Sequence, residues 1–434
     1  MPRNKSLQHQ LIDKFVRSIP LGLSYLASGG SLLIASASQL VTFAVLARSL
    51  GVDHFSVFVS ITAFTAVAVQ LCGLGAMDSL VRRVARDRSM YPVMLGHNLL
   101  LTFSTGGILL LVGLLSVPFL FPLSPDPLTN FSAYAMMLLA NVLMLRIIMM
   151  AEQVFIAHSD FGTSNRVVIV SAITRASAAI IACLVFNVTD VAYWAIWHFA
   201  ANGSIALLSL YWMRNLGKPV YRIVWDEVPL GFYFSTQFIF RALRQNADLM
   251  VLSIVTSAEV VSSYAVARRI LDSSYISIDA FYRLAYPGSA LATANGIHHA
   301  VERVRQMLLL TLAISVPTVL AIFALAPFLP LLFGDKYVSL VFFVQALCWA
   351  GVILAMYSAV LEMLSASGHQ GSRAAIFNTA NLLGAGLVMV AAYLAAVPGT
   401  LVATYIIEIG TAIAAWVVMG RLVETSRSKA ALAA

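Results

Sequence analysis

Two apolar stretches of the sequence contain charged and polar side chains at helical spacing, and these side chains offer the clearest chemistry. Within residues 229–256, Gln237, Arg241, Arg244 and Asp248 follow one another at intervals of four, three and four positions. Side chains at such intervals share one face of an α-helix. Because a guanidinium group binds two oxygens of a phosphate at once, this face is suited to an anion that contains phosphate.

The second stretch, residues 260–290, has a similar polar face. Its members recur every three or four positions: Tyr264, Arg268, Asp272, Tyr275, Asp279, Arg283 and Tyr286. Tyrosine rings stack on sugars and their hydroxyl groups form hydrogen bonds. The candidates for sugar contacts are Tyr264, Tyr275, Tyr282, Tyr286 and Gln237. Tyrosines between helices are also common as packing residues, and both interpretations stay open.

The two stretches together contain five arginines and three aspartates, which is two more cations than anions. Arginine near the centre of a bilayer costs about 2.5–3.5 kcal/mol, so these side chains must face protein or water. We predict that a hydrated, positive chamber for an anionic substrate is lined by Arg241, Arg244, Arg268, Arg269 and Arg283. The alternative is that Arg244 pairs with Asp248, and Arg268 with Asp272, one helical turn away, and that these pairs only hold the helices together.

Acidic residues within the apolar segments are candidates for coupling transport to a proton or sodium gradient, because a carboxyl group beside such a chamber can change its protonation state. These candidates are Asp248, Asp272, Asp279, Glu362 and Glu408. For a further acid, Glu152, a local pair with Arg146 or Arg175 is an equal alternative.

Catalytic residues, metal sites and cofactors are not expected. Gly217-Lys218 is followed by proline rather than serine or threonine, so it is not a phosphate-binding loop. Cys72, Cys183 and Cys348 lie far apart in apolar segments, which is typical of small buried side chains. An enzyme that acts on lipid-linked sugars stays a weaker alternative, because the longest outer loop, residues 122–130, is too short for an acceptor site.

The composition of the chain determines its surroundings. Of its 434 residues, 60% are hydrophobic and 11% are charged, whereas soluble domains have about 45–50% and about 25%. This excludes a water-soluble globule and predicts an all-α protein that crosses the membrane many times. The net charge of +8 is explained by basic residues in cytoplasmic loops, so no nucleic-acid partner is expected.

A window of about 20 apolar residues gives twelve predicted spans. They are residues 20–46, 55–80, 98–121, 131–156, 167–187, 191–213, 229–256, 260–290, 306–332, 338–364, 374–396 and 399–421. If the N-terminus is cytoplasmic, the inner segments contain 18 lysines and arginines and the outer loops contain 2. The predicted protein therefore has both termini in the cytoplasm.

An internal repeat divides the chain into two halves. Residues 46–58 and 256–267 share an acid, a serine three positions later and an aromatic residue two positions further, at an offset of 206. We predict an N-terminal bundle of six helices in residues 1–215, a cytoplasmic linker in 216–228 and a second bundle in 229–434. Six spans per half give parallel copies with a cavity between them. The serines and threonine on one face of the first span would form a third wall of this cavity: Ser24, Ser28, Ser31, Ser38 and Thr42.

Several loose motifs occur in a characteristic order: LVRRVA at residues 80–85, YPGSAL at 286–291 and LFGDKY at 332–337. With the twelve spans and the repeat, the chain resembles the Wzx-type flippases of O-antigen and exopolysaccharide synthesis. These belong to the multidrug/oligosaccharidyl-lipid/polysaccharide (MOP) exporter superfamily. The resemblance implies a MATE-like, V-shaped pair of six-helix bundles in a bacterial inner membrane, with a lumen lined mainly by spans one, two, seven and eight.

The resemblance also implies a substrate, undecaprenyl-pyrophosphate-linked oligosaccharide, which alternating access would move to the outer leaflet for lipopolysaccharide or exopolysaccharide biosynthesis. The expected partners are this lipid, the membrane lipid, and the polymerase and glycosyltransferases of the same pathway. Multidrug relatives export cations, so a MATE-like cation or drug antiporter is the main alternative. The surplus of arginine argues against that alternative.

Overall fold

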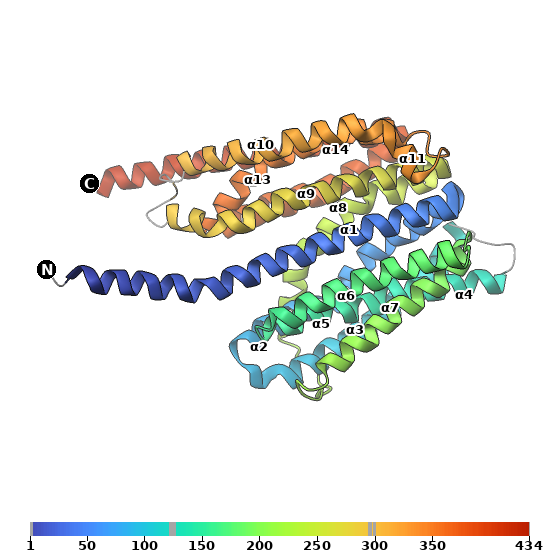
Figure 1. The fold of residues 1–434 in the computed structure, drawn as a ribbon, viewed down its shortest axis with the longest axis horizontal. Helices are drawn as coiled ribbons and strands as arrows, with labels where there is room; N and C mark the ends of the chain where they lie inside the picture. Colours follow the sequence, from blue (N-terminus) through green and yellow to red (C-terminus); the bar gives the residue numbers. More distant parts are fainter. Residues whose placement is uncertain (1–2, 121–126, 294–296, 298–300, 434) are drawn as a thin grey trace.

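Two groups of helices, one from each half of the chain, make up the computed structural model of the protein (Figure 1). The structure describes residues 3–120, 127–293, 297 and 301–433. These described residues form helices and no strand, which confirms the predicted all-α fold. The helix α1 runs between the two groups and packs against α6 in one and against α8 and α9 in the other.

The N-terminal group follows the chain from α1 to α7. Its helices are α1 (Arg3–Leu71), α2 (Ala76–Arg86), α3 (Tyr91–Leu120), α4 (Pro127–Leu138), α5 (Leu145–Ala157), α6 (Phe161–Ile180) and α7 (Val191–Met213). The π-helical segment η2 (Leu139–Met144) joins α4 to α5, and η3 (Ile181–Val185) extends α6. Aspartates begin two of these helices, since Asp160 accepts a hydrogen bond from the backbone of Thr163 and Asp190 accepts one from that of Ala192.

The C-terminal group follows from α8 to α14. Its helices are α8 (Glu227–Val255), α9 (Ala258–Ala292), α10 (Val301–Leu325), α11 (Leu329–Phe333), α12 (Leu340–Leu347), α13 (Ala350–Ala366) and α14 (Gln370–Ala433). The helix α14 is broken at Ala395 and Ala396, and α1 is broken at Gly51, whose φ of 68° favours glycine. Each of these two long helices therefore contains two of the predicted spans.

Eight helices in the described part of the chain are long and apolar enough to cross a membrane. The helices α8 and α9 are not among them, although each has the length of a span. Both contain the charged stripes, which lower their hydropathy. The multi-pass membrane architecture is thus clear, while the number twelve stays a prediction.

The apolar core is shared by the two halves at one end of the molecule only. At this end, which we call the junction end, one cluster joins Phe55 and Phe58 of α1 to Tyr264 and Phe343 of the other half. Away from it, each half has a core of its own. Both chain termini lie at the opposite end, which we call the terminal end (Figure 1). The side of the membrane that each end faces stays a prediction.

Hydrogen bonds between the halves strengthen the junction end. The Ser262 hydroxyl donates to the carbonyl of Val52 over 2.7 Å, and the Tyr337 hydroxyl donates to that of Ala47 over the same distance. Val52 and Ser262 belong to the two copies of the repeated motif. The motifs that were matched in the sequence are therefore in contact in space.

At the terminal end, one glutamate connects the halves. Glu227, at the start of α8, is 1% exposed and accepts from Arg82 Nη2 at 2.5 Å and from Arg83 Nε at 2.6 Å, both on α2. Burial opposes ionisation of this carboxyl, but the hydrogen bonds from Arg83 and Arg82 prevail and lower the pKa of Glu227. Beside it, a Cβ on Gly75 would lie 1.9 Å from the Gly231 carbonyl oxygen, so only glycine permits this approach of α2 and α8.

The three cysteines are free and buried, as predicted.

Candidate functional site: an arginine-lined cavity

The predicted polar stripes of α8 and α9 meet at a cavity of about 270 Å³. Its walls come from α8, α9, α12, α13 and α14, all of which belong to the C-terminal half. We expected this site to lie between the two halves, with the serine face of the first span as a wall. In the structure α13 and α14 pack across the polar faces of α8 and α9, so the described lining comes from the C-terminal half and includes none of the α1 side chains that the structure describes.

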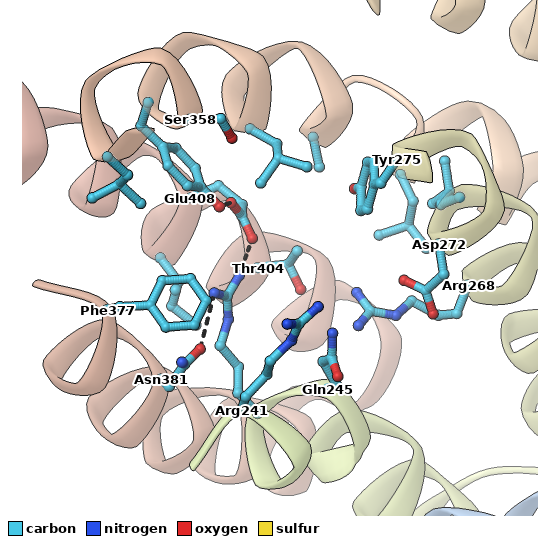
Figure 2. Close-up of a pocket in the computed structure, with 18 of the residues that line it drawn as sticks. Arg241, Gln245, Arg268, Asp272, Tyr275, Ser358, Phe377, Asn381, Thr404 and Glu408 are labelled. Atoms are coloured by element: carbon cyan, nitrogen blue, oxygen red, sulfur yellow. Dashed lines mark hydrogen bonds and ion pairs between the residues drawn. The ribbon is translucent and has the colours of Figure 1, made fainter. Parts of the chain in front are cut away.

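Six of the predicted stripe residues line this cavity, so the two stripes face a common space, and the candidate sugar contact Tyr282 lines it too. The six are Arg241, Arg244, Asp248, Arg268, Asp272 and Tyr275. Two of the predicted coupling acids, Glu362 and Glu408, also line it from α13 and α14. Figure 2 shows Arg241 and Arg268 extending from α8 and α9 toward the middle of the space.

Arg244 is held on three sides. Its guanidinium donates to Glu408 Oε1, and Nη1 donates to Asn381 Oδ1 at 3.4 Å (Figure 2). The second oxygen of Glu408 accepts from the Tyr357 hydroxyl at 2.8 Å. The stem of Arg244 passes over Gly384, where an added Cβ would lie 3.4 Å from Arg244 Cδ.

Arg268 pairs with an acid on the neighbouring helix. Its Nε lies 3.6 Å from Asp248 Oδ2, and that oxygen also accepts from the Tyr264 hydroxyl at 2.6 Å. The predicted pairs within one helix, Arg244 with Asp248 and Arg268 with Asp272, are therefore wrong. Acids from other helices lie closer to each guanidinium than the acid one turn along its own helix.

Among the side chains that the structure describes, four arginines and four acids line the cavity, so this part of the lining has no surplus of positive charge. The arginines are Arg241, Arg244, Arg268 and Arg373, and the acids are Asp248, Asp272, Glu362 and Glu408. In both ion pairs the cation is the more accessible partner. The Arg244 side chain is 19% exposed against 10% for Glu408, and that of Arg268 is 24% exposed against 3% for Asp248.

Arg241 differs from these paired arginines. It is exposed to the cavity and forms no hydrogen bond or ion pair with any residue that the structure describes. A free guanidinium one turn from Arg244 and opposite Arg268 is the first group that an entering anion would meet. Because phosphate oxygens match its donor geometry, the accessible side of the cavity is suited to such a group.

Three predicted site residues lie elsewhere. Arg269 faces α1, where its guanidinium stacks over the Phe43 ring with 5.3 Å between the guanidinium carbon and the ring centre. Tyr264 is 0% exposed behind Asp248, so it cannot contact a sugar in the cavity. Gln237 is exposed on α8 but is not part of the lining. The helical period placed Gln237 on the stripe, but the cavity ends before this turn of α8.

The side chains of Asp279, Arg283 and Tyr286 lie outside the described part of the structure, as do those of Ser24 and Ser28.

Arg146 and Arg175, within the apolar helices of the N-terminal half, form no ion pair with an acid that the structure describes. Arg146 is 2% exposed and its Nε has no partner among the described residues, while Arg175 Nε donates to its own helix at the Ser171 carbonyl. Neither forms an ion pair with Glu152 in the described part of the chain. The suggested local pair is therefore not observed. Arg175 also lies near enough to Arg269 for the two charges to repel each other.

Several lining residues were not singled out from the sequence. They are Gln245, Tyr357, Ser358, Arg373, Phe377, Asn381 and Thr404. Gln245 lies one turn from Arg241 on the same face and could have been found by extending the stripe. The others are isolated polar or aromatic residues of apolar segments, whose pattern gives no indication of which face is turned inward.

The chain matches, over residues 24–292, the family described as polysaccharide biosynthesis protein. It belongs to that family. None of the curated proteins compared with the chain is significantly similar to it in sequence. The family match covers the N-terminal half together with α8 and α9, and so includes both arginine stripes of the cavity.

Solved structures of MATE transporters have the same fold. An inward-facing multidrug resistance MATE transporter of the MOP superfamily has a TM-score of 0.73 at 14% identity, covering 94% of this chain and 99% of its own. An outward-facing one scores 0.63 at 15% identity, covering 93% and 96%. A MATE transporter of Vibrio cholerae scores 0.60 at 14% identity, covering 94% and 98%.

Family and fold together identify this polysaccharide biosynthesis protein as a transporter of the MOP superfamily. The resemblance seen in the sequence is confirmed at this level.

Proposed function

We propose that this protein is a flippase that moves a polyprenyl-pyrophosphate-linked oligosaccharide across a bacterial inner membrane by alternating access. The membership in a polysaccharide biosynthesis family and the exporter fold both support this proposal. The observation that supports it most is the cavity, where the free Arg241 and the accessible side of Arg268 face Tyr275 and Tyr282. This combination offers cations for a diphosphate and aromatic rings for the first sugars.

In this proposal the diphosphate and the first sugars occupy the cavity while the polyprenyl tail stays in the lipid. The two halves then exchange which end is open. A proton or sodium gradient resets them, because no phosphate-binding loop for a nucleotide is present in the sequence. Arg269, which stacks over Phe43 of α1, would extend the positive path from the cavity toward the N-terminal half.

Complementation of a strain that lacks its own flippase tests the proposal. Arg241→Ala and Arg268→Ala should each abolish export of the polysaccharide while the protein is still present at normal abundance in the membrane. Arg421→Ala is the matched control, since Arg421 is exposed on α14 and is not one of the lining residues. Full export by both cavity variants would reject the proposed site.

A cation or drug antiporter is the second candidate, because the MATE neighbours include multidrug transporters and four acids line the cavity. Two of these acids are already bound to arginines, which leaves fewer charges for a cation. Expression in a drug-sensitive host decides between the candidates. We expect no added resistance to cationic dyes.

A further inference from the structure

We propose that Glu408 competes with the anionic substrate for Arg244. In the empty cavity Glu408 pairs with the Arg244 guanidinium. An entering anion displaces Glu408 from this guanidinium, and the released carboxylate then binds a proton. This inference extends the proposed function, because it assigns to the same cavity a means of linking substrate binding to proton uptake. It depends on the contacts between three helices, α8, α13 and α14.

The first argument is that Glu408 occupies the position that a phosphate oxygen would take. It accepts from the Arg244 guanidinium on one oxygen and from the Tyr357 hydroxyl at 2.8 Å on the other. A guanidinium and a hydroxyl are also the donors that bind phosphate. The carboxylate therefore stands in for the cargo while the cavity is empty of cargo.

The second argument concerns access. Arg244 lines the cavity and its side chain is 19% exposed, whereas the whole of Glu408 is 7% exposed behind it. An anion that has entered at Arg241 meets Arg244 one turn along α8. It can take over the accessible face of this guanidinium without first displacing α14.

The third argument is the charge balance of the exchange. Arg244 and Glu408 are neutral as a pair, so the pair gives no net attraction to an anion. When Arg244 turns to the anion, the carboxylate stays nearly buried beside a second negative charge and has lost the cation that compensated it. Uptake of one proton by the Glu408 carboxylate makes it a neutral acid and leaves the charge of Arg244 for the anion.

Other charged and titratable groups surround this exchange. They are Arg241 and Asp248 on α8, Arg268, Asp272, Tyr275 and Tyr282 on α9, Glu362 on α13 and Arg373 on α14. Asp248 already accepts from Tyr264 and from the backbone of Leu249 and lies 3.6 Å from Arg268. Asp272 is an acid that lines the same cavity but does not pair with Arg244. It is therefore a matched control for removing one negative charge.

The experiment measures protons taken up when the purified full-length protein binds inorganic sulfate. Sulfate is a phosphate analogue whose charge does not change between pH 5.5 and 8. Calorimetric titrations in two buffers of different ionisation enthalpy give the number of protons per bound anion. For the unaltered protein we expect about one proton, and an affinity that rises up to about tenfold per unit fall in pH.

Two variants show which carboxyl group takes up the proton. Glu408→Gln should bind sulfate about tenfold more tightly than the unaltered protein at pH 7.5, with proton uptake near zero. Asp272→Asn should keep the uptake of about one proton. Binding without proton uptake in the unaltered protein, or loss of uptake in Asp272→Asn but not in Glu408→Gln, would overturn the proposal.

The proton count in the unaltered protein does not depend on how any variant folds. The titration uses neither lipid nor sugar, so its outcome is separate from the complementation test. Loss of export in Arg241→Ala with no proton uptake would contradict only the exchange at Glu408. Proton uptake with full export in the arginine variants would contradict only the assigned cargo.

Discussion

Two glutamates of this transporter bind arginines in nearly buried positions, yet their surroundings differ. Glu227 at the terminal end is 1% exposed, binds Arg82 and Arg83, and connects α8 to α2 of the other half. Glu408 is 7% exposed, binds Arg244, and connects helices within the C-terminal half beside a cavity. The first contact joins two bodies, while the second borders a space that a ligand can enter.

The comparison shows that the surroundings of a buried ion pair decide whether it only stabilises the fold or can also exchange its partner for a ligand. Burying a carboxylate is costly unless a cation compensates it, and both glutamates satisfy this requirement. At Glu227 two arginines from one helix share the charge, and this site does not contribute to the cavity lining. At Glu408 the single arginine also faces the cavity, so its partner can be exchanged.

The largest effect should follow removal of both arginines at the terminal end. Arg82→Ala with Arg83→Ala leaves Glu227 buried without a cation, and we expect a loss of about 3–5 kcal/mol in stability. Thermal unfolding of the purified protein in detergent measures it. Arg86→Ala is the control, because Arg86 is exposed on the same helix. Equal melting temperatures for the double variant and the control would show that Glu227 does not link the halves.

Removing Arg244 at the cavity should lower the stability of the protein by a smaller amount. Arg244→Met leaves Glu408 with the Tyr357 hydroxyl as its remaining donor among the described residues, and we expect a loss of about 2–3 kcal/mol in stability. Adding Glu408→Gln should restore most of the stability, because the uncompensated charge is then gone. The same unfolding assay compares the single and double variants. A double variant less stable than Arg244→Met would contradict the compensation.

Acid should weaken the terminal contact. The pKa of Glu227 is below its ordinary value of 4.5, so the contact contributes its full stability above about pH 4.5 and loses it as the pH falls through the lowered pKa. We expect the stability advantage of the unaltered protein over Glu227→Gln, about 1–2 kcal/mol at neutral pH, to shrink at acidic pH. Melting temperatures of both proteins between pH 3 and pH 7 measure it. An advantage that grows on acidification has the wrong sign for this account.

The smallest effect concerns the glycines beside Arg244. A Cβ on Gly384 would lie 3.1 Å from Ile407 Cγ2 and 3.4 Å from Arg244 Cδ, whereas one on Gly386 would meet nothing within 4 Å. Gly384→Ala should therefore cost about 1 kcal/mol, and Gly386→Ala should be neutral or slightly stabilising because alanine favours the helix. Their melting temperatures compare them. Equal stability of the two variants would show that Arg244 is held less closely than its contacts indicate.

The sequence was sufficient for the fold and for half of the cavity. Apolar windows and helical periods depend on neighbouring residues, so they predicted the helices and placed Arg241, Arg244 and Asp248 on one face. The same helical period placed Arg268, Asp272 and Tyr275 on one face of α9. Ser262 and Val52, from the two matched segments, are in contact, while the duplication itself stays a prediction.

What the sequence could not provide was the packing of one helix on another. The pairing of Arg244 with Glu408 joins residues 164 positions apart, and no periodicity connects them. For the same reason the cavity was assigned to the space between the halves, although α13 and α14 cover it from within one half. Arg269 is adjacent to Arg268 and therefore faces α1, about a quarter turn away on the helix.

The central claim is that Arg241 and Arg268 bind the anionic part of the cargo inside the C-terminal half. Anomalous scattering from crystals soaked in selenate, an analogue of phosphate, locates a bound anion directly. We predict a peak within the cavity between these two guanidinium groups, and its loss in Arg241→Ala. Anomalous peaks only outside the cavity, or a cavity peak unchanged in Arg241→Ala, would contradict the claim.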